Sequence, residues 1–101
     1  MEIIYVPSGN ELRIMPVGEL DEHAADDARD SIDNTLTKGK YNKVVLDMSR
    51  LSFMDSAGIG VLVGRFKKFG SSAAFYIASP TLPVDKILKL SGIYTIMPKL
   101  N

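Results

Sequence analysis

The 101-residue chain contains no cysteine and only one histidine, His23. The absence of cysteine excludes disulfides, thiolate catalysis and cysteine metal sites, and a single histidine cannot build a histidine metal cluster. No apolar run approaches the ~20 residues that a membrane-spanning helix requires. The N-terminus also lacks the pattern of a secretory signal. These absences predict a small cytoplasmic protein without a metal, and with no contact to a membrane.

The chain carries no excess charge of either sign, because twelve basic residues balance twelve acidic ones. A nucleic-acid-binding surface is usually basic, so direct binding to nucleic acid is not expected. Apolar residues make up 46% of the chain and charged residues 24%, which is ordinary for a globular protein. The length suits one domain with one core, and we expect that domain to span residues 1–101.

Alternating and helical apolar patterns predict an α/β fold in the order β-β-α-β-α-β-α-β. The expected strands cover residues 3–6, 12–16, 44–46, 73–78 and 94–96. The expected helices cover residues 21–38 and 56–69, and a third starts within 79–83 and ends at Gly92. Residues 47–53 are interpreted as a polar turn, and Pro16 is expected to end its strand. Strand–helix–strand alternation favours parallel crossovers, so the prediction is a mixed sheet covered by helices.

The first helix is expected to be capped by Asp21 and to end at Gly39, a residue able to take a positive φ. Its outer face is expected to be solvated, and that face includes Asp33. A buried stripe should lie on the other side, formed by Leu20, Ala24, Ala25, Ala28, Ile32 and Leu36. The third helix is expected to bury Val84, Ile87, Leu88 and Leu90.

The stretch from residue 43 to residue 69 organises the rest of the chain. A buried strand leads through the expected turn to a helix start that carries two capping residues, Asp55 and Ser56. Ser56 is expected to be the N-cap or a first-turn residue. Because a helix N-terminus attracts phosphate, the site suits either a bound phosphate or a phosphate attached to Ser56. A plain serine cap is the ordinary alternative.

The helix over residues 56–69 is expected to face the core through Ile59, Leu62, Val63, Phe66 and Phe69. The opposite side would then present Ala57, Val61, Gly64 and Lys68. Small and apolar residues at exposed positions favour a docking face for a partner protein. Scattered exposed apolar residues are also common, and they need no function.

Three further patterns resemble chemical sites, and each has a simpler explanation. His23 and Ser56 are a candidate catalytic pair, although an exposed histidine near a helix start is far more frequent. The glycines at 58, 60 and 64 do not make a phosphate-binding P-loop, because the Gly-Lys-Ser/Thr ending is missing and they fall inside a helix. The carboxylates of Asp21, Asp47 and Asp55 suit a cation site, but capping and solvated acids explain them better.

Several motifs in order carry a family resemblance. Residues 53–65 read FMDSAGIGVLVGR, residues 18–21 read GELD, residues 44–47 read VVLD and residues 91–93 read SGI. Together these motifs resemble the bacterial anti-sigma factor antagonists known from sporulation, which are small STAS domains. The resemblance extends over most of the chain. It implies the same mixed sheet covered by helices.

The resemblance implies a regulator that catalyses nothing and needs no cofactor. Its partner would be an anti-sigma factor that is itself a Ser/Thr protein kinase using ATP, and binding would free the sigma factor. The kinase would phosphorylate Ser56 to end binding, and a PP2C-type phosphatase would reset the protein. Asp21 and Asp55 match acids beside the family's phosphorylation site. The expected partner contacts are Asp21, Asp55, Ala57, Gly58, Val61 and Gly64.

Two alternatives stay open at this point. One is a STAS module of another signalling or transporter-regulating system, in which Ser56 is never phosphorylated. The other is a small-nucleotide-binding protein or weak hydrolase that acts through the N-terminus of the helix over residues 56–69.

Overall fold

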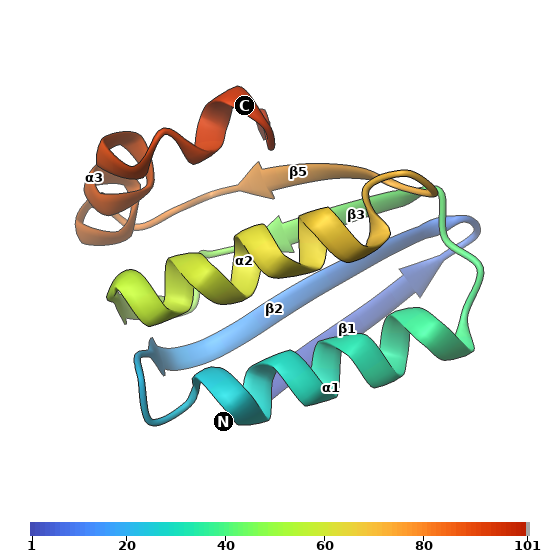
Figure 1. Cartoon of the computed structure of the whole chain (residues 1–101), viewed down its shortest axis with the longest axis horizontal. Coiled ribbons are helices and arrows are strands. Elements are labelled where there is room, and N and C mark those ends of the chain that lie inside the picture. The colour runs from blue at the N-terminus through green and yellow to red at the C-terminus, as the bar shows by residue number, and fades with distance from the viewer. Residues whose placement is uncertain (101) are drawn as a thin grey trace.

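The computed structural model describes residues 1–100, which form a six-stranded mixed sheet with three α-helices (Figure 1). This confirms the predicted α/β class. The elements in chain order are β1 (Glu2–Ser8), β2 (Glu11–Leu20), α1 (Ala25–Lys38), β3 (Lys43–Asp47), β4 (Leu51–Met54), α2 (Ser56–Phe69), β5 (Ala74–Ala78), α3 (Leu82–Ser91), the 3-10 helix η1 (Ile93–Thr95) and β6 (Lys99–Leu100).

The strands lie in the order β1-β2-β3-β5-β6, and β4 pairs with β2 outside this path. The β1–β2 hairpin is antiparallel, whereas the pairs β2–β3, β3–β5 and β5–β6 are parallel. The parallel strands therefore end at one edge of the sheet, where α2 and α3 begin (Figure 1). This is the edge at which open α/β sheets usually place their sites.

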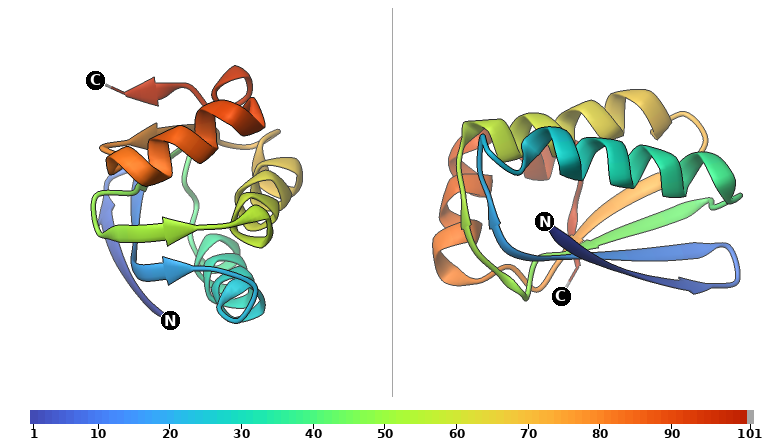
Figure 2. Two further views of the ribbon diagram at one scale, coloured as in Figure 1. Left: turned by 90° about the vertical axis from the view of Figure 1, so that its left-hand side faces the viewer. Right: turned by 90° about the horizontal axis from the view of Figure 1, so that it is seen from below.

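Helices α1 and α2 lie side by side over one face of the sheet, and α3 packs against β4 at the end of the sheet (Figure 2). The core fills the space between the sheet and the two helices. Ile14, Leu46 and Ile77 are buried on the sheet side, and Ile32 and Leu62 are buried on the helix side. Their burial supplies the main stabilising term of the fold.

Strand β4 is a correction to the expected polar turn at residues 47–53. Its ends, Leu51 and Met54, are buried, and it pairs in parallel with the last residues of β2. This pairing exists because β2 does not stop at Pro16 but runs on to Leu20. Pro16 pairs with Ile3 of β1 and falls between the stretches of β2 that pair with β3 and β4, so a residue without an N–H is tolerated there.

The predicted strand over residues 94–96 is also wrong. Gly92 adopts φ 77°, which ends α3 as expected and turns the chain into η1. Tyr94 then donates its hydroxyl proton to Asp85 Oδ1 at 2.5 Å, so this segment packs back on α3, and the last strand forms only at β6. Leu90 lies outside the core, with 80% of its surface exposed.

Helix α1 differs from the prediction at both ends. It begins at Ala25 rather than at Asp21, and Gly39 has an extended φ of −103° instead of a positive one. The absence of a side chain at Gly39 serves a different purpose, because an added Cβ would overlap the ring of Tyr41.

Among residues 1–100, no helix has both the length and the apolar character needed to cross a bilayer.

Candidate functional site

The start of α2 is built by Asp55, which is the N-cap residue with an extended backbone (φ −116°, ψ −170°). Its Oδ1 accepts the N–H groups of Ala57 at 2.9 Å and Gly58 at 3.1 Å. Ser56 is therefore the first helical residue and not the cap, and its side chain is exposed. Of the two positions expected for Ser56, the first turn is correct.

Capping by Asp55 changes the chemistry expected at this helix end. Two of the N–H groups that a bound phosphate would need are already bonded to a carboxylate of the same chain. A free phosphate or nucleotide would also meet the negative charge of Asp55. The geometry therefore favours an exposed serine hydroxyl over a phosphate-binding helix end.

The same carboxylate joins α2 to the loop between β2 and α1. Asp55 Oδ2 accepts the N–H of Glu22 at 3.2 Å, and the N–H of Asp55 donates to the carbonyl of Leu20 at 3.4 Å. Asp21 stands between these two bonds, so the structure brings it beside Asp55 and Ser56. Three of the expected site residues therefore share one edge of the molecule.

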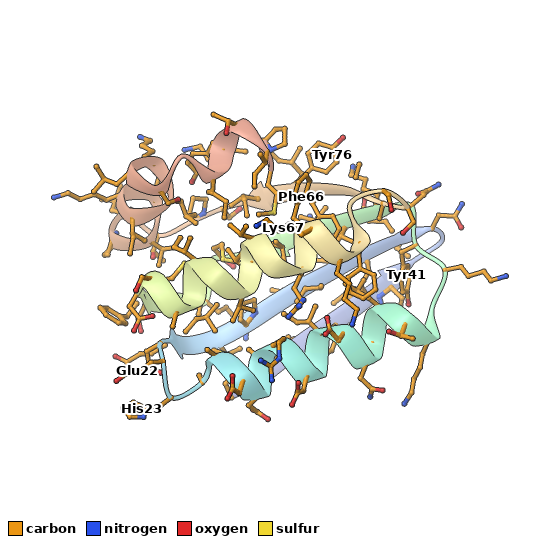
Figure 3. All side chains as sticks on the ribbon, viewed as in Figure 1. Glu22, His23, Tyr41, Phe66, Lys67 and Tyr76 are labelled. Atoms are coloured by element: carbon orange, nitrogen blue, oxygen red, sulfur yellow. The ribbon has the colours of Figure 1, made fainter. Side chains whose placement is uncertain are left out.

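Asp21 caps a turn rather than the helix predicted for it. Its Oδ1 accepts the N–H groups of His23 at 3.0 Å and Ala24 at 3.1 Å, and α1 starts only at the next residue. These two hydrogen bonds fix the conformation of the loop between β2 and α1, and Asp55 binds that loop at Glu22. Glu22 and His23 project from this loop at the same end of the molecule (Figure 3).

Gly58 was expected on the partner surface, but it is buried. An added Cβ would overlap the carbonyl oxygen of Leu20 and would lie 2.7 Å from Cγ of Met54. Glycine is needed here because the first turn of α2 packs directly on the end of β2. Its role in the structure is close packing.

Val61 was also expected to be exposed, and this expectation is wrong, since only 6% of its surface is accessible. The reason is that α2 packs against both the sheet and α1. These two contacts bury more of the helix surface than the single core-facing side that was predicted. Its buried residues are Gly58, Val61, Leu62 and Arg65. A charge at position 61 would disturb the core, so it would not test a docking face.

The exposed side of α2 runs from Ser56 through Gly60 toward Gly64 and the lysines of the last turn. A Cβ added at Gly60 or at Gly64 would meet nothing within 4 Å. The helix backbone is therefore accessible at Gly60 and Gly64, in the turns that follow Ser56. Gly60 was not among the predicted contacts, but it is exposed on this side of α2, whereas Val61 is buried.

A small groove separates α1 from α2 beside this face. It has a volume of about 210 Å³ and is lined by Ala25, Asp26, Arg29, Ala57, Gly60, Val61 and Arg65. Ala57, an expected contact residue, is half-buried in it. A groove of this size suits one side chain of a partner, since drug-sized ligands need ~300 Å³ or more.

Arg65 and Asp33 form an ion pair between the two helices that sequence reasoning missed. Arg65 Nε lies 2.8 Å from Asp33 Oδ1, and 9% of the arginine side chain is exposed. The two atoms are close but poorly aligned for a hydrogen bond, so the contact is chiefly ionic. Lys68 adds a second cation 3.3 Å from Asp33. Asp33 is thus not solvated as expected, because α2 covers it.

The candidate catalytic pair receives no support from the geometry. The side chain of His23 is 87% exposed, and its Nε2 lies 3.9 Å from Oε1 of Glu22. Among residues 1–100, its ring makes no hydrogen bond to Ser56. The glycines at 58, 60 and 64 lie within α2, as expected, and therefore form no phosphate-binding loop.

The three expected carboxylates do not assemble into a cation site. Asp47 lies at the end of β3, where Arg13 Nη1 donates to it at 2.8 Å and the N–H of Ser49 donates at 2.9 Å. Burial alone would raise the pKa of Asp47, but the hydrogen bonds from Ser49 and Arg13 lower it below its ordinary value. Within residues 1–100, no group of three or more His, Cys, Asp or Glu side chains is placed to hold a metal.

The STAS domain family pattern matches residues 4–101 of the sequence. The chain belongs to the STAS domain family. The anti-sigma F factor antagonist of Paenibacillus polymyxa is 38% identical over 84 residues, which are 80% of this chain and 70% of that protein. This confirms the resemblance drawn from the sequence motifs.

Two solved structures extend the comparison. The anti-sigma factor antagonist SpoIIAA in its unphosphorylated form is 26% identical, with a TM-score of 0.82 over 99% of this chain and 89% of that one. The phosphorylated form of the Bacillus cell fate determinant SpoIIAA is 25% identical, with a TM-score of 0.73 over 99% and 92% of the two chains. Within the STAS family, this chain groups with the anti-sigma factor antagonists of the SpoIIAA type, which are generally regulators and not enzymes.

Proposed function

We propose that this STAS domain binds an anti-sigma factor through the edge around Ser56, and that phosphorylation of Ser56 ends the binding. One observation carries the proposal: Ser56 is exposed at the first position of α2, and hydrogen bonds through Asp55 hold the Asp21 loop beside it. Relatives named as anti-sigma F factor antagonists support the class of partner.

The docking surface combines the Asp21 loop, Asp55 and the open side of α2. Ala57, Gly60 and Gly64 have no long side chains, so the backbone of a partner can approach the helix closely. The α1–α2 groove beside them offers room for one partner side chain. Gly58 and Val61 support this surface from within, since both are buried.

The partner in this proposal is a Ser/Thr protein kinase that uses ATP. During transfer, the Ser56 Oγ–H loses its proton to a base of the kinase, and a bond forms between Oγ and the γ-phosphorus. The bond from that phosphorus to the β–γ bridging oxygen breaks, and ADP leaves. The STAS domain is the substrate, so it needs no catalytic base. A PP2C-type phosphatase would reset it, and the use of ATP places the cycle in the cytoplasm.

Charge explains how the phosphate would act. It adds about −1.5 to −2 charges at pH 7. The helix end stabilises an exposed anion by only about 0.3–1 kcal/mol, and Asp55 already bonds two of its N–H groups. At about 6 Å and an effective dielectric constant near 20, repulsion by one carboxylate costs roughly 3 kcal/mol before screening by salt. Solvent reduces this repulsion in the free domain, so the main loss falls on the interface.

In the direct test, the purified protein is incubated with its cognate anti-sigma kinase and ATP. Phosphopeptide mapping then identifies the phosphorylated residue. Phosphate is expected on Ser56 alone, and Ser49, Ser52, Ser71 and Ser72 are the exposed controls. Phosphate on a control serine, or no phosphate at all, would favour a STAS module of another signalling system.

A further inference from the structure

A second concave region lies at the other end of the molecule from Ser56. It has a volume of about 390 Å³, within the usual range for small-molecule sites. Its lining comes from the β1–β2 turn, the last turn of α1, the α1–β3 loop, the end of α2 and the loop after it. The lining residues are Asn10, Leu36, Gly39, Lys40, Tyr41, Asn42, Phe69, Ser72 and Ala73. Tyr41 lies at this end, far from Glu22 and His23 (Figure 3).

The floor and walls of this pocket are apolar. Leu36 and Ala73 are buried at its base, and the rings of Tyr41 and Phe69 pack against the core at its sides. The Tyr41 ring is held against the backbone of Gly39, where any Cβ would overlap it. A flat aromatic wall is therefore part of the fold, and it suits a planar ligand.

The rim of the pocket is polar, and its Asn10, Lys40 and Asn42 side chains have no hydrogen-bond or ion-pair partner within residues 1–100. The backbone groups of Asn10 and Asn42 are used, since the carbonyl of Asn10 accepts the N–H of Asn42 at 2.9 Å and the carbonyl of Asn42 accepts the N–H of Ala74 at 2.9 Å. Within the part of the chain that the structure describes, the side-chain amides of both asparagines make no hydrogen bond. Over the same residues, Lys40 forms no ion pair. The rim thus keeps one cation and two amides available.

The sign of the ligand charge follows from this lining. Among residues 1–100, Lys40 is the only charged residue in the pocket lining, which contains no carboxylate from those residues. The C-terminal ends of α1 and α2 carry partial negative charge that opposes an anion. Lys38 and Lys67 in their last turns offset this effect, whereas Lys68 is paired with Asp33.

We propose that this pocket binds a small aromatic carboxylate, with its ring against Tyr41 and Phe69 and its acid group at Lys40 and the two asparagines. The site is independent of Ser56, which lies at the opposite end of α2. Ligand binding at this pocket therefore does not depend on the proposed regulatory function of Ser56.

The test is an amide-resolved NMR titration of the purified chain with indole-3-acetate. Acetate lacks the ring and indole-3-acetamide lacks the charge, so both are expected to bind at least about tenfold more weakly. Saturable shifts are expected at residues 39–42 and 69–73. Shifts that do not saturate, or that saturate elsewhere, would overturn the proposal.

Variants separate the pocket from general charge effects. Lys40→Gln is expected to weaken indole-3-acetate binding about tenfold, and Asn42→Ala should weaken it less. The matched control is Lys86→Gln on α3, which removes the same charge from an exposed residue outside the pocket and should leave the affinity unchanged. Equal losses in Lys40→Gln and Lys86→Gln, or no loss in Lys40→Gln, would contradict a site at Lys40.

Discussion

The carboxylate of Asp55 accepts the backbone N–H of Glu22 at 3.2 Å while it also caps α2. One side chain thus sets both the start of the helix that carries Ser56 and the position of the loop that carries Asp21. The candidate site is held together by this residue more than by any contact of the serine itself.

The first prediction concerns this cap. Asp55→Ala should lower the free energy of unfolding by about 1–2 kcal/mol, because two helix N–H groups and the N–H of Glu22 lose their acceptor. Asp55→Asn keeps a capping oxygen and should lose much less. Urea unfolding of both variants measures the difference, and equal stability of the alanine variant and the parent would show that the cap is not needed.

The second prediction concerns the switch. Ser56→Ala should bind the cognate anti-sigma factor constitutively, because alanine is small and cannot take a phosphate. Ser56→Asp should bind about two to three decades more weakly, which corresponds to a loss of about 3–4 kcal/mol. Calorimetric titration measures both affinities, and circular dichroism checks that both variants are folded. Tight binding by a folded Ser56→Asp variant would mean that charge at this position is not the switch.

The third prediction compares two glycines of α2. Gly60→Ala should raise the free energy of unfolding by about 0.5–1 kcal/mol, since the new methyl group meets nothing and alanine favours the helix. Gly58→Ala should lower it by about 1–3 kcal/mol, because the methyl group overlaps the backbone of Leu20. Chemical denaturation of the two variants gives the sign of each change. The same sign for both would be inconsistent with the packing described.

The fourth prediction concerns the ion pair between the helices. Asp33→Ala leaves Arg65 buried without its partner and should cost about 3 kcal/mol of stability. Arg65→Met with Asp33→Ala removes both charges and should recover part of that loss. A double-mutant cycle from unfolding midpoints measures the coupling, and simple additivity of the two substitutions would argue against the pair.

The fifth prediction concerns acid stability. Hydrogen bonds from Tyr94 and Lys99 lower the pKa of Asp85 from 3.8 to about 2. Burial raises the pKa of the Tyr94 hydroxyl, and its hydrogen bond to the Asp85 carboxylate raises that pKa further. A carboxylate with a lowered pKa in the folded state stabilises the fold above its unfolded pKa, and this contribution is lost as the pH falls through the folded value. The stabilisation by Asp85 should therefore be complete above about pH 5 and should fade between pH 4 and pH 2.

The measurement is thermal unfolding of the parent and Asp85→Asn over that range of pH. The difference in melting temperature between them should shrink as the pH falls. A constant difference from pH 5 to pH 2 would mean that ionisation of Asp85 does not stabilise the C-terminal segment.

Local pattern in the sequence was sufficient to predict the class of fold and the position of Ser56 and Asp55 at the start of α2. The apolar run at residues 44–46 and the helical spacing after Asp55 predict a buried strand and a helix because both depend on neighbours along the chain. The placement of Ser56 in the first turn follows from the same local rules of helix starts. Family motifs added the fold and the candidate role of the serine.

Contacts between elements distant in the sequence could not be predicted in this way. Strand β4 forms only because β2 continues past Pro16 to pair with it, and β4 has no pattern of its own. Val61 and Arg65 are buried because α1 lies beside α2. The apolar pattern of α2 alone carries no information about which helix packs next to it. Gly58 likewise serves a backbone contact with Leu20 that lies 38 positions away in sequence numbering.

Which residues face a partner was therefore a tertiary question. From the sequence alone, the spacing of small residues on α2 predicted that a docking side exists. The packing of α2 against both the sheet and α1 decided that Gly60 and Gly64 are open to solvent, while Gly58 and Val61 are buried. The physical reason is that helix propensity and capping act within one turn, whereas burial depends on every element that packs around a residue.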